Sequence, residues 1–190
     1  MGKKRIALYG VGVNDSKTAL SSLQNGLTAY DRWSQMLRRC YGDPGEYPTY
    51  SGCIVCDDWL LFSNYYSWFS KNYIPGFQVD KDLLIVGNKV YSPDTCLFVP
   101  NWLNSFIISC KSKRGKYPVG VSKLGKKYVA HCNDPSDGKR EYLGLHESPD
   151  KAHQCWLKRK LEHAQNLKPH MDNIDIRIYP NVLEIIKAML

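Results

Sequence analysis

The sequence predicts an α+β protein in which a helical, aromatic-rich first half precedes a three-stranded antiparallel sheet packed on a helix. In the first half, apolar residues recur at steps of three and four, which is typical of amphipathic helices. Three short stretches near 118–124, 126–133 and 139–146 indicate strands, and a helical pattern follows from about 150 to 167. Apolar residues make up 43% of the chain and aromatic residues 12%, which is enough for a core and excludes a wholly disordered protein.

The first helix is expected to begin at Thr28, because Thr28 and Asp31 have the spacing of a capping box. It should end before the Gly/Pro cluster GDPGEYP, which is typical of a loop. One face of this helix is apolar and contains Tyr30, Trp33, Leu37 and Cys40.

A second helix is predicted to begin near Asp57 and Asp58, whose charges suit a helix N-terminus. Aromatic side chains share one face of it, and such stripes usually belong to a protein core. The members of this stripe are Trp59, Phe62, Tyr66 and Phe69.

Two strands, 79–86 and 89–99, are then expected to meet at the turn Gly87-Asn88, before a helix that begins at Pro100-Asn101. Residues 111–118, KSKRGKYP, have the composition of a linker. The predicted domains are therefore 1–110 and 111–168, with a tail at 169–190.

The predicted helix near 150–167 would bury Ala152, Trp156, Leu161 and Ala164, and would direct Lys158, Arg159 and Lys160 toward water. In the tail, Ile174, Ile176 and Ile178 alternate as in a strand, and Pro180-Asn181 would begin a final helix.

The net charge of +8 is concentrated in the second half of the chain. Residues 111–168 contain 14 Lys/Arg against 6 Asp/Glu, whereas residues 1–110 contain 10 against 9. Such a local excess favours a polyanionic partner, nucleic acid above all, over a surface whose charges are merely solvated.

The chain contains no run of about 18 apolar residues that would span a membrane, and its first apolar stretch is too short for a secretory signal. We therefore expect a soluble, cytoplasmic protein that does not act at a membrane.

Seven cysteines without the spacing of a disulfide framework favour reduced thiols. A structural zinc site with Cys53-x-x-Cys56 as one arm is the alternative to buried free thiols. Its four ligands would be Cys40, Cys53, Cys56 and Cys96.

Residues 118–156 resemble the Apetala2-type DNA-binding domain of plant transcription factors and phage homing endonucleases. The matching pieces, in order, are Gly120-Val121, Lys127-Tyr128-Val129-Ala130, Asp134-Pro135, Leu143-Gly144 and Ala152. The resemblance implies that the sheet enters the major groove of double-stranded DNA, without a cofactor. The residues it places at the DNA are Lys123, Lys127, His131, Asn133, Arg140 and Tyr142. Arg and Asn can bind purine edges through two hydrogen bonds, and Lys neutralises phosphate. Because Ser122, His131 and Asn133 stand where the family usually has Arg or Glu, its preferred base sequence does not transfer.

The first half resembles phage-encoded proteins in which an HNH-like (ββα-metal) unit precedes an Apetala2-type domain. The pieces that carry this resemblance are YDRWSQMLRRCY, Pro48-Thr49-Tyr50, Val55 to Trp59, Phe62, Trp68, Asp80-Lys81-Asp82 and YSPDTCLFVP. An HNH nuclease needs a histidine base, an asparagine that orients it, and ligands for a divalent metal.

In this mapping Lys81 takes the position of the base, Cys96 lies at that of the orienting asparagine, and the metal ligands fall on Asp80 and Asn104. Oxygen ligands of this kind suit magnesium. All five histidines lie in the second half or after it. Asp80 and Asp82 favour the charged form of Lys81, which opposes a role as base.

These patterns predict a phage-type protein that recognises DNA sequence and does not cleave it, in the cytoplasm of a bacterial host. One alternative is an active homing-type endonuclease that uses magnesium at Asp80 and Asn104. Another is an interaction protein whose aromatic half binds a host enzyme.

Overall fold

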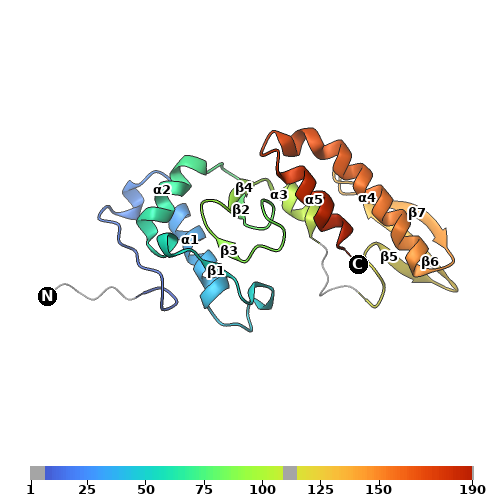
Figure 1. Ribbon diagram of the computed structural model, residues 1–190, viewed down its shortest axis with the longest axis horizontal. Helices are drawn as coiled ribbons and strands as arrows, with labels where there is room; N and C mark the ends of the chain where they lie inside the picture. Colours follow the sequence, from blue (N-terminus) through green and yellow to red (C-terminus); the bar gives the residue numbers. More distant parts are fainter. Residues whose placement is uncertain (1–6, 109–114, 190) are drawn as a thin grey trace. The chain divides into compact units, whose positions relative to one another are not determined.

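The computed structural model describes residues 7–108 and 115–189, and it confirms the α+β class (Figure 1). The chain divides into two compact units at Phe98 and Val99. The division falls before the helix at 101–107, so that this helix belongs to the second unit. Residues 111–114 of the expected linker lie outside the described residues.

The first unit contains the two predicted helices. These are α1 (Gly26–Tyr41) and α2 (Phe62–Asn72), with short 3-10 helices at Leu20–Ser22, Pro48–Tyr50 and Asp57–Leu60. The expected capping box at Thr28 is wrong, because α1 begins two residues earlier. Its N-cap is Asn25, and the Asp31 carboxylate accepts a hydrogen bond from the Gln35 side chain instead.

The second predicted helix is interrupted at Leu61, which has an extended backbone conformation. Val13 is the cause of the interruption. Its N–H donates to the Leu60 carbonyl and its carbonyl accepts from the Phe62 N–H, at 2.8 and 3.0 Å. These bonds to a distant segment replace those that a continuous helix would make.

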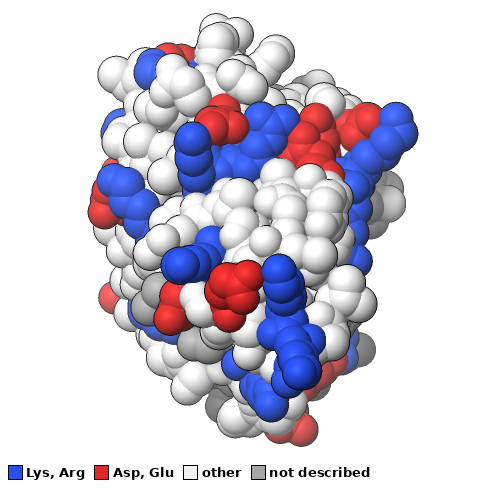
Figure 2. All heavy atoms as spheres, turned by 90° about the vertical axis from the view of Figure 1, so that its right-hand side faces the viewer, with Lys and Arg blue, Asp and Glu red and all other residues white. Residues whose placement is uncertain are grey.

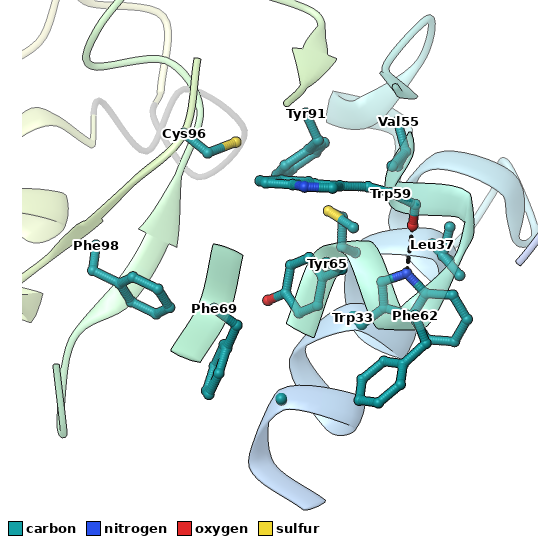
Figure 3. Close-up of a cluster of buried hydrophobic side chains, with 12 residues drawn as sticks. Trp33, Leu37, Val55, Trp59, Phe62, Tyr65, Phe69, Tyr91, Cys96 and Phe98 are labelled. Atoms are coloured by element: carbon teal, nitrogen blue, oxygen red, sulfur yellow. Dashed lines mark hydrogen bonds between the residues drawn. The ribbon is translucent and has the colours of Figure 1, made fainter. Parts of the chain in front are cut away.

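An aromatic cluster forms the core of the first unit (Figure 3). Trp59, Phe62 and Phe69 of the predicted stripe are buried, which confirms their role in the core. Tyr66 is only half-buried, and Tyr65 is buried in addition to the predicted members. The indole N–H of Trp33 donates to the Trp59 carbonyl at 2.6 Å, so that α1 is tied to the 3-10 helix ahead of α2. Buried indole groups generally need such a partner.

The strands of the first unit are shorter than predicted. They are β1 (Ile54–Val55), β2 (Gln78–Asp80), β3 (Val90–Tyr91) and β4 (Leu97–Val99), the last of which reaches the unit boundary. β1 pairs with β3 in parallel and β2 pairs with β4. The expected continuous strands 79–86 and 89–99 are therefore wrong. One reason is that the Asp80 carboxylate accepts the N–H groups of Asp82 and Leu83, both at 2.8 Å, and so ends β2 in a turn.

The second unit contains the predicted sheet and the helix that packs on it (Figure 1). Its elements are α3 (Asn101–Ile107), β5 (Val121–Leu124), β6 (Lys127–Asn133), β7 (Arg140–His146), α4 (Pro149–Asp172) and α5 (Ile178–Lys187). The sheet is antiparallel, as predicted, and β6 lies in its centre. Ser148 caps α4 by accepting the Lys151 N–H at 3.2 Å.

The tail differs from the prediction. α4 continues to Asp172, and the expected strand around Ile174–Ile178 is wrong because these residues form a turn and the start of α5. Ile178, Val182 and Ile186 recur at a helical spacing and are buried, and α5 packs against α4. Burying these three on one helical face leaves Ile176 in the turn, 76% exposed.

The buried face of α4 includes Ala152, Trp156 and Ala164, as predicted, whereas Leu161 is only half-buried. His153 and His163 are buried as well. Of the expected outward-facing residues, Lys158 is exposed, but Arg159 binds Glu141 and Lys160 lies over the ring of Phe106.

None of the helices in the described ranges is both long enough and apolar enough to cross a membrane.

Gly120 is required where the sheet meets α4, because its φ is +80° and a Cβ there would lie 2.1 Å from the indole Cδ1 of Trp156. We expect Gly120→Ala to lower the free energy of unfolding by about 2–4 kcal/mol, from overpacking and a left-handed backbone. Gly138→Ala is the matched control, because Gly138 has a φ of +71° with nothing within 4 Å of its added Cβ. It should cost only about 1 kcal/mol. Equal losses in urea denaturation would contradict the packing argument.

Candidate nucleic-acid interface

The register of β6 against β7 places four of the predicted DNA-binding residues on one face of the sheet. His131 lies opposite Tyr142 and Asn133 lies opposite Arg140. The pair between them, Cys132 and Glu141, points to the other face, where Glu141 binds side chains of α4. Since side chains alternate along a strand, the first two pairs point away from α4.

These four side chains are accessible and contact one another. Asn133, Arg140 and Tyr142 are exposed, and His131 is partly so. A guanidinium nitrogen of Arg140 lies 3.1 Å from Nδ1 of His131, and the rings of His131 and Tyr142 are 5.8 Å apart. Burial, and then the charge of Arg140, hold the pKa of His131 below its usual value. A neutral His131 that accepts from Arg140 through Nδ1 presents Nε2–H as a donor to solvent.

The two predicted lysines lie on different faces. Lys127 lies two positions before Val129 and four before His131, so its side chain points to the same face as theirs. It is exposed there, and its Nζ lies 3.2 Å from a carboxylate oxygen of Glu147. Lys123 lies opposite Tyr128, on the same face as Ala130 and Cys132. The expectation that Lys123 shares a face with His131 is therefore wrong. The two-residue turn between Leu124 and Lys127 fixes this register.

Basic side chains are distributed rather than gathered on the face that Figure 2 shows. Lys and Arg form several groups there, with Asp and Glu between them. Lys111, Lys113 and Arg114, which contribute to the charge excess, lie outside the described residues. Phosphate contacts on the sheet would therefore come from individual side chains such as Lys127.

A charged network joins the sheet to α4. The Glu141 carboxylate accepts from Arg159 at 2.6 and 2.9 Å, and its Oε2 lies 2.8 Å from Nε2 of His163. The hydrogen bonds of Arg159 first, and of His163 second, lower the pKa of Glu141 to about 2. Residue patterns did not indicate this network, because Arg159 occupies a helical position that predicts exposure.

The same place offers a set of metal-binding atoms. Within the described ranges, Cys132, Glu141 and His163 are the one His/Cys/Asp/Glu group whose ligand atoms all lie within 4.8 Å of one another. Sulfur, oxygen and nitrogen ligands of this kind suit zinc. However, Arg159 already binds both oxygens of Glu141, and burial raises the pKa of Cys132. A metal would have to displace the guanidinium and a thiol proton, so the group fits better as a structural network.

The four cysteines of the expected zinc site do not form such a group, although the structure describes all of them. Burial raises the pKa of Cys40 to about 11 and that of Cys96 to about 12, so both thiols keep their protons near neutral pH. Free thiols, the alternative reading, describe them better.

Lys81, at the position of the nuclease base, is 6% exposed and hydrogen-bonded through its ammonium group. Its Nζ donates to the Asp82 carboxylate at 2.5 Å and to the Asn88 carbonyl at 2.9 Å. Burial acts to lower the pKa of Lys81, but the hydrogen bond and charge of Asp82 outweigh it and the pKa is raised. A charged ammonium with no available lone pair cannot deprotonate water.

The remaining positions of the nuclease motif do not form a catalytic set in either unit. Asp80 belongs to the first unit and Asn104, on α3, to the second, so neither unit by itself contains both expected metal ligands. Oδ1 of Asp80 accepts two backbone N–H groups. Cys96 is buried, with its Sγ 3.9 Å from Oγ1 of Thr95, and has no group to orient.

The network around Glu141 should make stability depend on pH in acid. Because the pKa of Glu141 falls from 4.5 to about 2 on folding, its contribution is complete above pH 4.5 and is lost as the pH falls toward 2. We expect Glu141→Gln to flatten this part of the profile of unfolding free energy, measured by urea denaturation. The control is Glu147→Gln, at a carboxylate whose side chain is 72% exposed. If both variants kept the wild-type profile, the network would not contribute as described.

Comparisons with known proteins add no support to the resemblances to an Apetala2-type domain and to an HNH-like unit, which are based on the sequence motifs alone. No protein-family model matches the chain, and searches of curated proteins and of solved structures likewise find no match.

Proposed function

We propose that the protein binds double-stranded DNA through the face of β6 and β7 that points away from α4, and that it does not cleave the DNA. The observation that carries this proposal is the pairing of His131 with Tyr142 and of Asn133 with Arg140 on that face. Four side chains able to contact bases or phosphates thus lie side by side on two adjacent strands.

The chemistry and dimensions of this face suit the major groove. Arg140 can donate two hydrogen bonds to guanine, Asn133 can bind adenine, and Lys127 can neutralise a phosphate. Neighbouring strands lie about 4.8 Å apart, so a two-stranded ribbon fits a groove about 12 Å wide. The cytoplasm of a phage-infected bacterium, as the setting, is part of the proposal and rests on the family resemblance.

The absence of cleavage is proposed from the state of Lys81. Its ion pair with Asp82 raises its pKa, and its ammonium is also bound by the Asn88 carbonyl. We therefore interpret residues 79–82, VDKD, as a structural turn, in which Asp80 ends β2 and Lys81 binds the carbonyl of Asn88 in the following loop.

We expect Arg140→Ala to weaken binding to a specific duplex by roughly 5- to 150-fold, equivalent to about 1–3 kcal/mol for a base contact made through two hydrogen bonds. Combining it with Asn133→Ala should weaken binding further. Fluorescence anisotropy at fixed salt measures both, on duplexes selected from a random pool.

The matched control is Lys151→Ala, which removes the same charge from an exposed position in the first turn of α4. It should change affinity much less than Arg140→Ala. Equal effects of the two variants would mean that net charge alone, and not this face, determines binding.

Wild-type protein is expected to leave supercoiled plasmid intact with or without magnesium, because no residue of the motif can act as the base. The measurement is a nicking assay on agarose gels. Magnesium-dependent cleavage by the wild-type protein would overturn this part of the proposal if Asp80→Ala abolished it. Asp43→Ala, at an exposed loop carboxylate, is the control and should then retain the cleavage.

A further inference from the structure

The second unit contains a cavity of about 700 Å³ beside the end of the proposed DNA-binding face. Aromatic residues of α3 and α4 form part of its wall, and Asn133, Arg140 and Lys160 line it as well. The last residue of β6 that pairs with β5 is Ala130, so β6 extends past β5 and leaves this space open. Cavities of this size are typical of small-molecule sites.

Lys160 supplies a cation without a counterion to this cavity. Its Nζ lies 3.7 Å from the ring centroid of Phe106, and it forms no ion pair with any carboxylate of the described residues. Burial lowers its pKa to about 8. An ammonium held in this way favours an anion that can replace the lost hydration.

Trp102 offers the aromatic surface. The indole of Trp156 is nearly covered, because it stacks on His153 at 5.3 Å and Gly120 packs against its Cγ and Cδ1. The ring face of Phe106 is occupied by the ammonium group of Lys160. Trp102 meets the His170 ring edge to face at 6.5 Å, but it is only half-buried and lines the cavity. It therefore keeps surface for a planar ligand.

The charge of the wall limits the ligand. Asp134 also lines the cavity, and hydrogen bonds from Ser136 lower its pKa, so it is charged at neutral pH. One carboxylate then opposes the cations Lys160 and Arg140. A single phosphate suits this balance better than a triphosphate does.

We propose that this cavity binds one unstacked nucleotide, with its base on Trp102 and its phosphate at Lys160. The nucleotide is either free in solution or an unpaired nucleotide of a DNA strand bound to the neighbouring face. Only the second source rests on the proposed function, since Asn133 and Arg140 lie both on that face and at the cavity. Stacking of a base on an aromatic side chain is a common way to bind an unpaired nucleotide, and it tolerates any base.

Two titrations test the proposal. In the first, deoxyadenosine monophosphate is titrated into the full-length protein by calorimetry, with deoxyadenosine and inorganic phosphate as comparators. We expect saturable binding of the monophosphate, and at least tenfold weaker binding of either comparator. In the second, anisotropy compares a fully paired duplex with the same duplex carrying one unpaired nucleotide, which should bind more tightly.

Lys160→Met should weaken monophosphate binding at least tenfold and remove the preference for the unpaired nucleotide. Trp102→Leu should weaken it about fivefold or more, and provides a second variant at a half-buried position. Lys158→Met, at an exposed position of the same helix, is the matched control and should change neither result. Circular dichroism verifies that each variant is folded.

Affinity for the monophosphate should fall as the pH rises above 8, because Lys160 then loses its proton. The other titratable or charged groups that line the cavity are His131, Cys132, Asp134 and Arg140. Lys160→Met separates their contribution, since its affinity should not show the same fall.

Each outcome decides between the two proposals. If neither the monophosphate nor the unpaired nucleotide binds preferentially, or if phosphate alone binds equally well, the nucleotide site is refuted. If the protein still binds paired DNA and this binding depends on Arg140, the proposed function remains supported although the nucleotide site is refuted. Conversely, Lys160-dependent binding of the monophosphate without any DNA binding supports a site for free nucleotides and refutes the proposed function.

Discussion

The register of β6 is the constraint on which the second unit depends. A slip of one residue would turn His131 and Asn133 toward α4 and expose Cys132, because side chains alternate along a strand. Two features fix the register. A two-residue turn joins β5 to β6, and Glu141, which lies opposite Cys132, binds Arg159 and His163 of α4. The proposed DNA-binding face thus depends on a charged network on the opposite side of the same sheet.

Lys81, which is buried, and Lys160, which is half-buried, show how their partners determine what the same side chain can do. Lys81 and Lys160 both lose hydration on folding, which disfavours the ammonium. Asp82 compensates Lys81, whose pKa rises, whereas Lys160 has an aromatic ring and no carboxylate, and its pKa falls to about 8. The first lysine is consequently a structural element of the VDKD turn. The second is a cation without a carboxylate partner, which favours an anionic ligand.

Prediction from the sequence succeeded where a pattern repeated over many residues. The helical spacing of Trp33 and Leu37 in α1, and of Ala152 and Trp156 in α4, identified both helices and their buried faces. It failed at 79–99, where the apolar stretches suggested two long strands but the structure contains the three short strands β2, β3 and β4. There the carboxylate of Asp80 and the pairing of β3 with β1 decided the outcome. In the tail, Ile178 fitted a strand with Ile176 but belongs to a helix with Val182.

The sequence by itself determined the fold class and the three-stranded antiparallel sheet packed on a helix, because these depend on local periodicity and turn chemistry. The four neighbouring residues of the proposed interface came from the family resemblance and from alternation along the strands. Only the tertiary structure decided that Lys123 lies on the other face, that Lys81 is paired, that Arg159 and Lys160 turn inward, and that a cavity lies beside Asn133. Each of these depends on which distant group comes within hydrogen-bonding or van der Waals distance. Residue spacing along one chain contains no direct record of such contacts, since they are set by how separate elements pack.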